Sequence, residues 1–475
     1  MRLDTAVIRR TINEQWRALP HNLKRAAVWL SQQARYHWPL VIVLALYCTA
    51  TLTLVFNIPE PGYGDATVTA PDEGAHYLFN VKYIVEHNAL PISGRDDLPA
   101  YHSCTQHHIG IAPCTYSYTV YPGPNYIVSA LFVKLFHRLG SAMSSVQAAR
   151  LTSFLSGIVF ILCSYAAVYS ITRRRAISTL LVAAVAFIPQ FLFVMSYINI
   201  DAHSAAISAF LGLCIVKFLQ KPRSVAWQMA LCIALFGLLP ISKYNYFALG
   251  LAGLILIGYT FVRQRFTKRE IIRFALFAAG SFVLLASFWY IRNIIVYHDP
   301  LGQSFMLKTM AHYAQLGTPY PTDFNGLNIA NQRDFFTTLF QSFFFALGLM
   351  HFYLDSSSYN MLWLLLLLCA GIMVYNYTNK KLRRFDLHTW GFVGLYALIV
   401  IGTLLVVLYN SLYYDFQPQG RYMYAILVPT LLLLAYAIRR DNRNTIIAYL
   451  LCSGTVYLFI AGISVFMKYY IPYHF

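Results

Sequence analysis

Charged residues are scarce in this chain: Asp, Glu, Lys and Arg together make up 11% of its 475 residues. A soluble globular domain carries about 25% charged residues, so the composition excludes that class. Hydrophobic residues reach 58%, and the mean hydropathy is +0.53. Apolar runs of about 17 residues or more recur along the sequence. These features predict an all-α, polytopic integral membrane protein.

Acidic residues are especially few, 18 against 36 Lys and Arg, which gives a formal net charge of +18. The basic residues are unevenly spread. Of the 36, 25 lie in the N-terminal segment and in short loops between alternate apolar runs, where only five acidic residues lie. Cytoplasmic loops of membrane proteins carry this excess. The basic balance therefore predicts a cytoplasmic N-terminus, and nucleic acid is not expected as a partner.

A cleavable signal peptide is not visible at the N-terminus. Segment 1–38 is polar and basic, with Trp16, Trp29 and Trp38 spaced along it. This pattern is typical of a cytoplasmic amphipathic helix on anionic lipid, or of a basic tail without fixed structure. We expect it to precede a single transmembrane domain over 39–475.

Eleven transmembrane helices are predicted in that domain. They cover about 39–57, 148–172, 176–197, 201–219, 224–240, 244–262, 271–291, 359–377, 387–409, 421–438 and 444–467. Two long outer loops follow from this topology, a first at 58–147 and a second at 292–358. Within them, 123–139 and 335–353 are expected to form interfacial helices. If both crossed the membrane, there would be thirteen spans, and three basic loops would face outside, against the charge bias.

Six of the eight cysteines lie inside apolar spans, where they are predicted to be small core residues. Cys104 and Cys114 lie in the first outer loop and are predicted to form a disulfide in an oxidising compartment. A metal site is the alternative, because three histidines crowd the same segment (His102, His107 and His108). The spacing matches no zinc motif, so no metal is assigned.

Polar residues that are costly at membrane depth gather at the predicted outer ends of the spans. They are Asp72, Glu73, His76, Tyr77, Asn199, Asp201, His203, Lys243, Asn245, Arg292, Asn293, Arg421 and Tyr422. Several also have a structural explanation: the arginines as interfacial anchors, the lysine by snorkelling, Asp201 by capping its helix and the histidines as buried structural residues. The gathering of carboxylates and three cations on one membrane face favours a functional site.

The charges of this set suggest a chemistry. A carboxylate beside a bilayer can act as general base on an acceptor hydroxyl. Arg and Lys can bind a phosphate and stabilise it as a leaving group. Together they suit the transfer of a sugar from a polyprenyl-phosphate donor on the outer face, where no nucleotide sugar is available.

Five short motifs carry a resemblance. They are PDEGAHY at 71–77, N-x-D at 199–201, SKYNY at 242–246, WYIRN at 289–293 with DPLG at 299–302, and QGRY at 419–422. From about residue 40 onward, the chain resembles a widespread bacterial family of polytopic membrane proteins related to the GT-C glycosyltransferases. The resemblance implies a GT-C fold in the bacterial inner membrane and an inverting transfer from a polyprenyl-phosphate sugar. A glycan or glycolipid acceptor is implied as the second partner.

The resemblance also assigns roles to residues. It makes Asp72 the catalytic base with Glu73 beside it, although the division of labour between the two stays open. His76, one helical turn after Asp72, could orient the base or the substrate. Some relatives hold a divalent cation on an acidic pair and others need none, so the cofactor is left unassigned. Since the chain ends just after its last predicted span, a lipid or polysaccharide acceptor is expected rather than a protein.

Two other functions fit parts of the pattern. An O-antigen or capsule polymerase also has many spans, large outer loops and outer-face arginines. A flippase or transporter of lipid-linked sugars would carry charges near mid-membrane in broken helices and often an internal repeat. Here the charges lie at the ends of spans and no repeat is visible, so transport is the weaker alternative.

Overall fold

The computed structural model describes residues 32, 35–61, 69–97, 118–302, 304–305, 308, 329–348, 350–378, 387–413 and 418–469. Two compact units are distinguished, 1–46 and 47–475. The first contains the start of helix α3, Trp38–Asn57, and the second contains the rest of the described chain. All contacts described below lie within the second unit. The predicted disulfide partners Cys104 and Cys114 lie outside the described residues.

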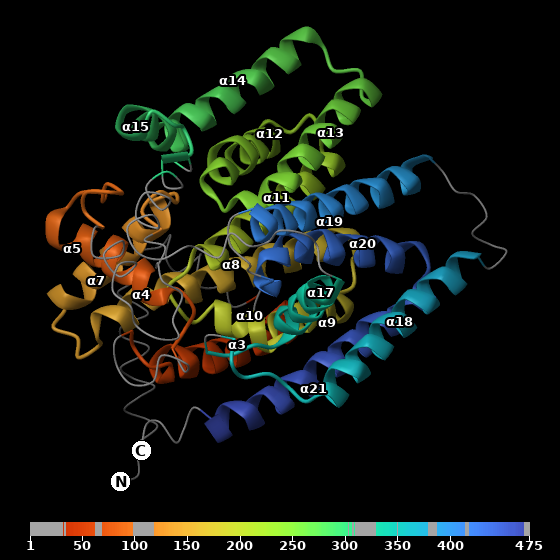
Figure 1. Ribbon diagram of the computed structural model, residues 1–475. Coiled ribbons are helices and arrows are strands. Elements are labelled where there is room, and N and C mark those ends of the chain that lie inside the picture. Colours follow the sequence, from red (N-terminus) through yellow and green to blue (C-terminus); the bar gives the residue numbers. More distant parts are fainter. Residues whose placement is uncertain are drawn as a thin grey trace, which may run out of the picture. The chain divides into compact units, whose positions relative to one another are not determined.

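Helices make up most of the described chain (Figure 1), and an isolated bridge between Leu347 and Phe352 is its one extended pairing. After α3, the first half contains α4 (Glu73–His76), η2 (Tyr77–Lys82), α5 (Tyr83–His87), α7 (Pro124–Arg138), α8 (Ser145–Thr172), α9 (Arg175–Ala186), α10 (Pro189–Val194) and α11 (Ile200–Gln220). Next come α12 (Val225–Cys232), η3 (Ile233–Leu238), η4 (Leu239–Ile241), η5 (Tyr244–Tyr246), α13 (Phe247–Arg263), α14 (Lys268–Leu285) and α15 (Ser287–Tyr297). The last part contains α17 (Ile329–Phe344), α18 (Ser356–Thr378), α19 (Leu387–Tyr413), η7 (Gly420–Ile426), α20 (Leu427–Arg440), η8 (Asn442–Asn444) and α21 (Thr445–Tyr469).

Eight helices of the described chain are long and apolar enough to cross a membrane. The number rises to nine if α14 and α15, which meet at a bend of 53°, are taken as one broken span. The all-α, multi-pass membrane class is thereby confirmed. The predicted count of eleven spans and the interfacial placement of 123–139 and 335–353 stay predictions. The first of these two stretches is the helix α7, and the second holds the end of α17.

Two predicted spans are irregular within their length: one is broken, and the other changes its helix type. The span expected at 176–197 consists of α9 and α10, separated at Phe187 and Ile188. The break has a cause in the sequence, because Pro189 disfavours helical geometry in the residue before it. The span expected at 224–240 starts as α12, passes into the π-helical turn η3 and ends in the 3₁₀ turn η4 at Pro240. Both changes shorten the helix just before a turn that carries polar residues.

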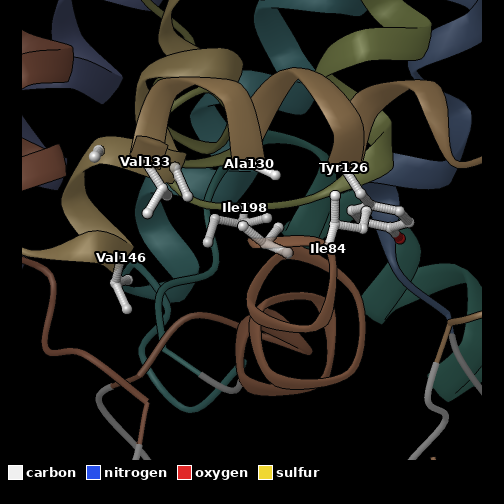
Figure 2. Packing of buried hydrophobic residues seen from close by; sticks show 9 residues of the cluster. Ile84, Tyr126, Ala130, Val133, Val146 and Ile198 are labelled. Carbon is white, nitrogen blue, oxygen red and sulfur yellow. The ribbon is translucent and has the colours of Figure 1, made fainter. Parts of the chain in front are cut away.

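A hydrophobic cluster fixes the first loop against the helices (Figure 2). Its buried members come from η2, α5, α7, α8 and the turn before α11, and they are Val81, Ile84, Tyr126, Ala130, Val133, Val146, Ala148, Ala149 and Ile198. Figure 2 shows Ile198 lying among the side chains of α7 and α5. Since α8 and α11 also pack along each other (Figure 1), the loop has a fixed position relative to the start of both helices.

Candidate active site

Asp72 ends the loop that precedes α4, and its backbone is unusual. Its φ of 63° and ψ of −3° place it in the left-handed region, which Asp tolerates better than most residues. Non-glycine residues in such conformations occur often at functional sites, where the surrounding structure holds them. The side chain is 26% exposed.

Asp201 and Lys243 form a buried ion pair next to it. Asp201 lies in the first turn of α11, and Lys243 lies in the turn between η4 and η5. The Nζ of Lys243 is 2.9 Å from Oδ1 and 3.0 Å from Oδ2 of Asp201. The backbone N–H of Lys243 also donates to Oγ of Ser204, at 2.9 Å. The lysine turn is thus fixed to α11 by both its backbone and its side chain.

Arg421 connects Asp72 to this ion pair. Its Nη2 donates to Oδ2 of Asp72 at 2.6 Å, its Nε lies 3.7 Å from Oδ2 of Asp201, and its Nη1 donates to the hydroxyl of Tyr197. We call Asp72, Asp201, Lys243 and Arg421 the charged cluster. Two carboxylates and two cations make it formally neutral, which lowers the cost of burying it.

Gly420, the residue before Arg421, allows η7 to pack closely against α17. Gly420 donates its N–H to Oγ of Ser342 in α17, at 2.8 Å. A Cβ at Gly420 would overlap the backbone of Phe343. Only glycine permits η7 to approach α17 this closely.

Tyr422 forms an aromatic wall beside the two cations. Its ring centroid is 3.8 Å from Nζ of Lys243 and 5.4 Å from the guanidinium carbon of Arg421. Cation–π contacts of this kind are attractive, more so where water is excluded. Asn245 helps to hold Tyr422 in place, since its Nδ2 donates to the backbone carbonyl of Tyr422 at 3.2 Å.

Exposure separates the two carboxylates of the cluster. The Asp201 side chain is 2% exposed and is held by both cations, whereas Asp72 is 26% exposed and contacts Arg421 alone among them. Burial by itself would raise the pKa of Asp72, but the charge and the hydrogen bond of Arg421, with a smaller contribution from Lys243, hold this pKa below its ordinary value. Asp72 is therefore an ionised carboxylate that is partly open to solvent.

The pKa of Lys243 is also lowered, but here burial is the cause. Burial lowers its pKa to about 8, although the carboxylate of Asp201 acts to raise it. Arg421 adds repulsion between like charges. The ammonium is consequently charged at neutral pH but titrates close to it.

His76 lies within the same region as a neutral side chain. Burial lowers its pKa to about 3, and the attraction of Asp72 does not compensate. Its Nδ1 is hydrogen-bonded to the hydroxyl of Tyr126 at 2.7 Å, and its ring lies 4.1 Å from that of Tyr118. These contacts join α4, next to Asp72, to Tyr126 of α7 and to Tyr118 before it.

Glu73, the neighbour of Asp72, points to a different partner. Its carboxylate receives hydrogen bonds from Nε and Nη2 of Arg150 at 2.8 and 2.6 Å, and from the N–H of Ile198 at 3.0 Å. Both charged side chains are completely buried. The guanidinium also donates to the carbonyls of Val55, Ile58 and Pro59. This pair therefore joins the end of α3, the first loop, α8 and the turn before α11.

Arg150 was not among the residues singled out from the sequence. The available signal is an arginine six residues into the helix α8, within a predicted span. Such residues are rare inside transmembrane segments and almost always have a partner. The identity of that partner depends on the tertiary packing.

Asn199 and Tyr77 have structural contacts. Asn199 caps α11, with Oδ1 accepting from the N–H of Ala202 at 2.8 Å and Nδ2 donating to the carbonyls of Val194 and Tyr197. Tyr77 packs against the hydrophobic cluster of Figure 2. Both residues shape the surroundings of the charged cluster without belonging to it.

Arg292 and Asn293 form a second polar group on α15. The Nη1 of Arg292 donates to Oδ1 of Asn293 at 3.0 Å, and its Nη2 donates to the carbonyl of Pro91. Its guanidinium carbon lies 5.1 Å from the ring centroid of Trp289. Of the three cations expected to converge, the structure therefore brings Lys243 and Arg421 together and places Arg292 against the first loop.

A divalent cation does not fit the charged cluster as it stands. Arg421 lies between Asp72 and Asp201, and Lys243 covers the remaining face of Asp201. Glu73 is held by Arg150. Within the described ranges, no three His, Cys, Asp or Glu side chains converge as metal ligands would. The positive charge at this site comes from the side chains of Lys243 and Arg421.

Part of the chain is similar to a known family. Residues 123–291 match the family model described as dolichyl-phosphate-mannose-protein mannosyltransferase. The matched stretch runs from α7 to α15 and contains Arg150, Asp201 and Lys243. It agrees with the resemblance to GT-C glycosyltransferases noted in the sequence. A comparison with curated proteins finds no significant match.

Two solved structures resemble the chain at low identity. One is an oligosaccharyltransferase of Archaeoglobus fulgidus tethered with an acceptor peptide, with 12% identity, a TM-score of 0.49 and coverage of 91% of this chain and 55% of that one. The other is ArnT from Cupriavidus metallidurans in the apo state, with 14% identity, a TM-score of 0.37 and coverage of 89% and 78%. This chain thus spans little more than half of the oligosaccharyltransferase. Both TM-scores are too low for any site or substrate to be carried over.

Proposed function

We propose that this protein is an integral-membrane glycosyltransferase that takes its sugar from a polyprenyl-phosphate donor. One observation carries the proposal: a partly solvent-exposed carboxylate, Asp72, is fixed by a buried arginine beside a second buried cation. The similarity of residues 123–291 to a family named for a dolichyl-phosphate-mannose donor supports a lipid-phosphate sugar as the donor class.

Each part of the transfer has a candidate residue. Asp72 accepts the proton of the acceptor hydroxyl as its oxygen attacks the anomeric carbon of the sugar. The bond between that carbon and the phosphate oxygen breaks, and the electron pair leaves with the polyprenyl phosphate. Lys243 and Arg421 stabilise the negative charge that develops on this leaving group. A single displacement from the face opposite the phosphate inverts the configuration at the anomeric carbon.

Glu73 and His76 act as positioning residues in this scheme. Glu73 is completely buried and saturated by Arg150 and Ile198, so an acceptor cannot reach its carboxylate. His76 is neutral and bonded to Tyr126. We assign the role of base to Asp72 alone, which gives the two adjacent carboxylates separate functions.

The bias of basic residues supports an orientation in the membrane. It assigns the N-terminus and the short basic loops to the cytoplasm, and the charged cluster to the outer face of a bacterial inner membrane. There the donor is a lipid-linked sugar, and the acceptor is a lipid-linked or cell-surface glycan.

The test compares cells with and without the protein by mass spectrometry of their surface glycans. If the protein adds a side branch, its deletion should lower the mass of the glycan by one sugar. Asp72→Asn should cause the same loss of mass at an unchanged protein level. A polymerase would instead shorten the chains. Unchanged glycans in the Asp72→Asn strain would contradict the proposal, and translocation of a lipid-linked sugar by purified protein without any covalent product would favour a flippase.

A further inference from the structure

An apolar cavity of about 260 Å³ lies between α8, α11, α13, α19 and α20. It is separate from the charged cluster, since none of the cluster's four residues lines it. Its walls are made mainly of aliphatic side chains such as Leu211, Leu256 and Leu432. An apolar cavity of this kind excludes water and accepts hydrocarbon.

The cavity extends toward the end of the helices opposite to the charged cluster. Asp201 lies in the first turn of α11, and the cavity is lined by residues of that helix from Ser208 to Gln220. At a rise of 1.5 Å per residue, Gln220 lies about 28 Å along the helix from Asp201. On the contiguous segment η7–α20, Arg421 lies at the start and the lining residue Arg439 lies at the other end.

One basic residue lines the far end of the cavity. Arg439 lines it, is exposed, and makes no hydrogen bond or ion pair with any residue that the structure describes. Two further lining residues, Ile171 and Gln220, are followed closely by Arg173 and Lys221. Phe392 and Tyr436 add aromatic side chains. Aromatic and basic residues of this kind are enriched at the membrane–water interface, where basic pockets between transmembrane helices bind anionic headgroups.

We propose that this cavity is a binding site for an anionic phospholipid of the cytoplasmic leaflet. One acyl chain fills the aliphatic space between α11, α13 and α20, and the headgroup phosphate pairs with Arg439. Charge complementarity at the mouth and the absence of charge along the walls together select this occupant. The proposal is independent of glycosyl transfer, because no residue of the charged cluster takes part.

Native mass spectrometry of the purified full-length protein in detergent tests it. The protein is titrated with phosphatidylglycerol, with phosphatidylcholine as the zwitterionic comparison. We expect tighter binding of phosphatidylglycerol, and about fivefold weaker binding after Arg439→Ala, since one basic residue contributes about that factor. Arg440→Ala is the matched control: Arg440 is the neighbouring arginine, contacts the hydroxyl of Tyr436 and does not line the cavity.

A second pair of variants tests the acyl-chain site. Leu256→Trp fills the cavity and should abolish the preferential retention of phosphatidylglycerol, whereas Ile255→Trp, on the exposed side of the same helix, should leave it intact. Thermal unfolding of both variants verifies that they are folded. Equal losses in Arg439→Ala and Arg440→Ala, or full binding in folded Leu256→Trp, would overturn the proposal. So would displacement of the phospholipid by a polyprenyl phosphate at an equal concentration, which would assign the cavity to the tail of a carrier lipid.

Discussion

Arg421 donates a hydrogen bond of 2.6 Å to the carboxylate of Asp72, across 349 positions of the sequence. The contact joins the residue before α4 to η7 and pairs a buried guanidinium with a carboxylate that is partly open to solvent. The same arginine reaches Asp201 and Tyr197. A change at Arg421 should therefore alter both the position and the basicity of Asp72.

Asp72→Asn should remove the base and leave the fold intact. The amide keeps the shape of the side chain and can still accept a hydrogen bond from Arg421, but it cannot take a proton. Loss of a general base typically lowers the rate by about 10²- to 10⁴-fold. The measurement is sugar transfer from a polyprenyl-phosphate sugar by purified protein, with Glu86→Gln, a change at an exposed acid of the same loop, as the control. Comparable rates in the two variants would rule out Asp72 as the base.

Arg421→Gln should change the pH dependence of the reaction. In the native protein, Arg421 lowers the pKa of Asp72 against the effect of burial. Without it that pKa rises, so Asp72 becomes protonated at a higher pH, and the acidic limb of the pH–rate profile shifts upward. We also expect a rate loss of about 10²-fold from the missing cation.

The control for this variant is Arg443→Gln, which breaks an equally short but exposed ion pair with Asp441. It should change neither the rate nor the profile. An acidic limb that stays at the same pH in Arg421→Gln would show that the limb does not report Asp72.

Lys243→Arg tests the second cation through the alkaline limb. The pKa of Lys243 is about 8, so its positive charge is lost as the pH rises through that value. Activity should fall over the same range, and an arginine, which stays charged, should move the limb to higher pH. An alkaline limb that is the same in both proteins would exclude Lys243 as its source.

Unfolding does not explain such a loss of activity. The folded pKa of about 8 lies below the value of about 10.4 for an unfolded lysine. Between these values the unfolded state binds more protons, so the contribution of Lys243 to stability increases with pH. Denaturant unfolding at pH 7 and pH 9.5 separates the two effects.

The sequence predicts the general arrangement of this site because the relevant signals are local. Apolar runs define the spans, and a polar residue at the end of a run is visible without any knowledge of packing. Asp201, Lys243 and Arg421 were identified in this way, and the structure brings them together with Asp72. Pro189 is a local signal for the break between α9 and α10, although 176–197 is predicted as one continuous span.

Which charged residues pair with each other could not be predicted from such local signals in the sequence. Asp72 and Glu73 are adjacent, and both are carboxylates beside a predicted span. Their different roles follow from the left-handed backbone of Asp72, which helps to separate the directions of the two side chains, and from Arg150, which reaches Glu73 from 77 positions away. Arg292 was grouped with the other cations by its place at the end of a span, whereas its contacts depend on the first loop.

The buried pair of Glu73 and Arg150 makes a prediction about stability rather than chemistry. Replacing one partner leaves an uncompensated charge in a site from which water is excluded, at a cost of about 3–5 kcal/mol. Glu73→Gln and Arg150→Met should each lower the free energy of unfolding by roughly this amount. The double variant should lose less stability than the sum of the two single variants, because neither charge is then left alone.

Molecules of Glu73→Gln that remain folded should retain transfer activity within about tenfold of the native rate, far above the level expected for Asp72→Asn. Denaturant unfolding in detergent together with activity per folded molecule measures both quantities. Additive stability losses would argue against a mutual pair, and a fully inactive but stable Glu73→Gln would move the base from Asp72 to Glu73.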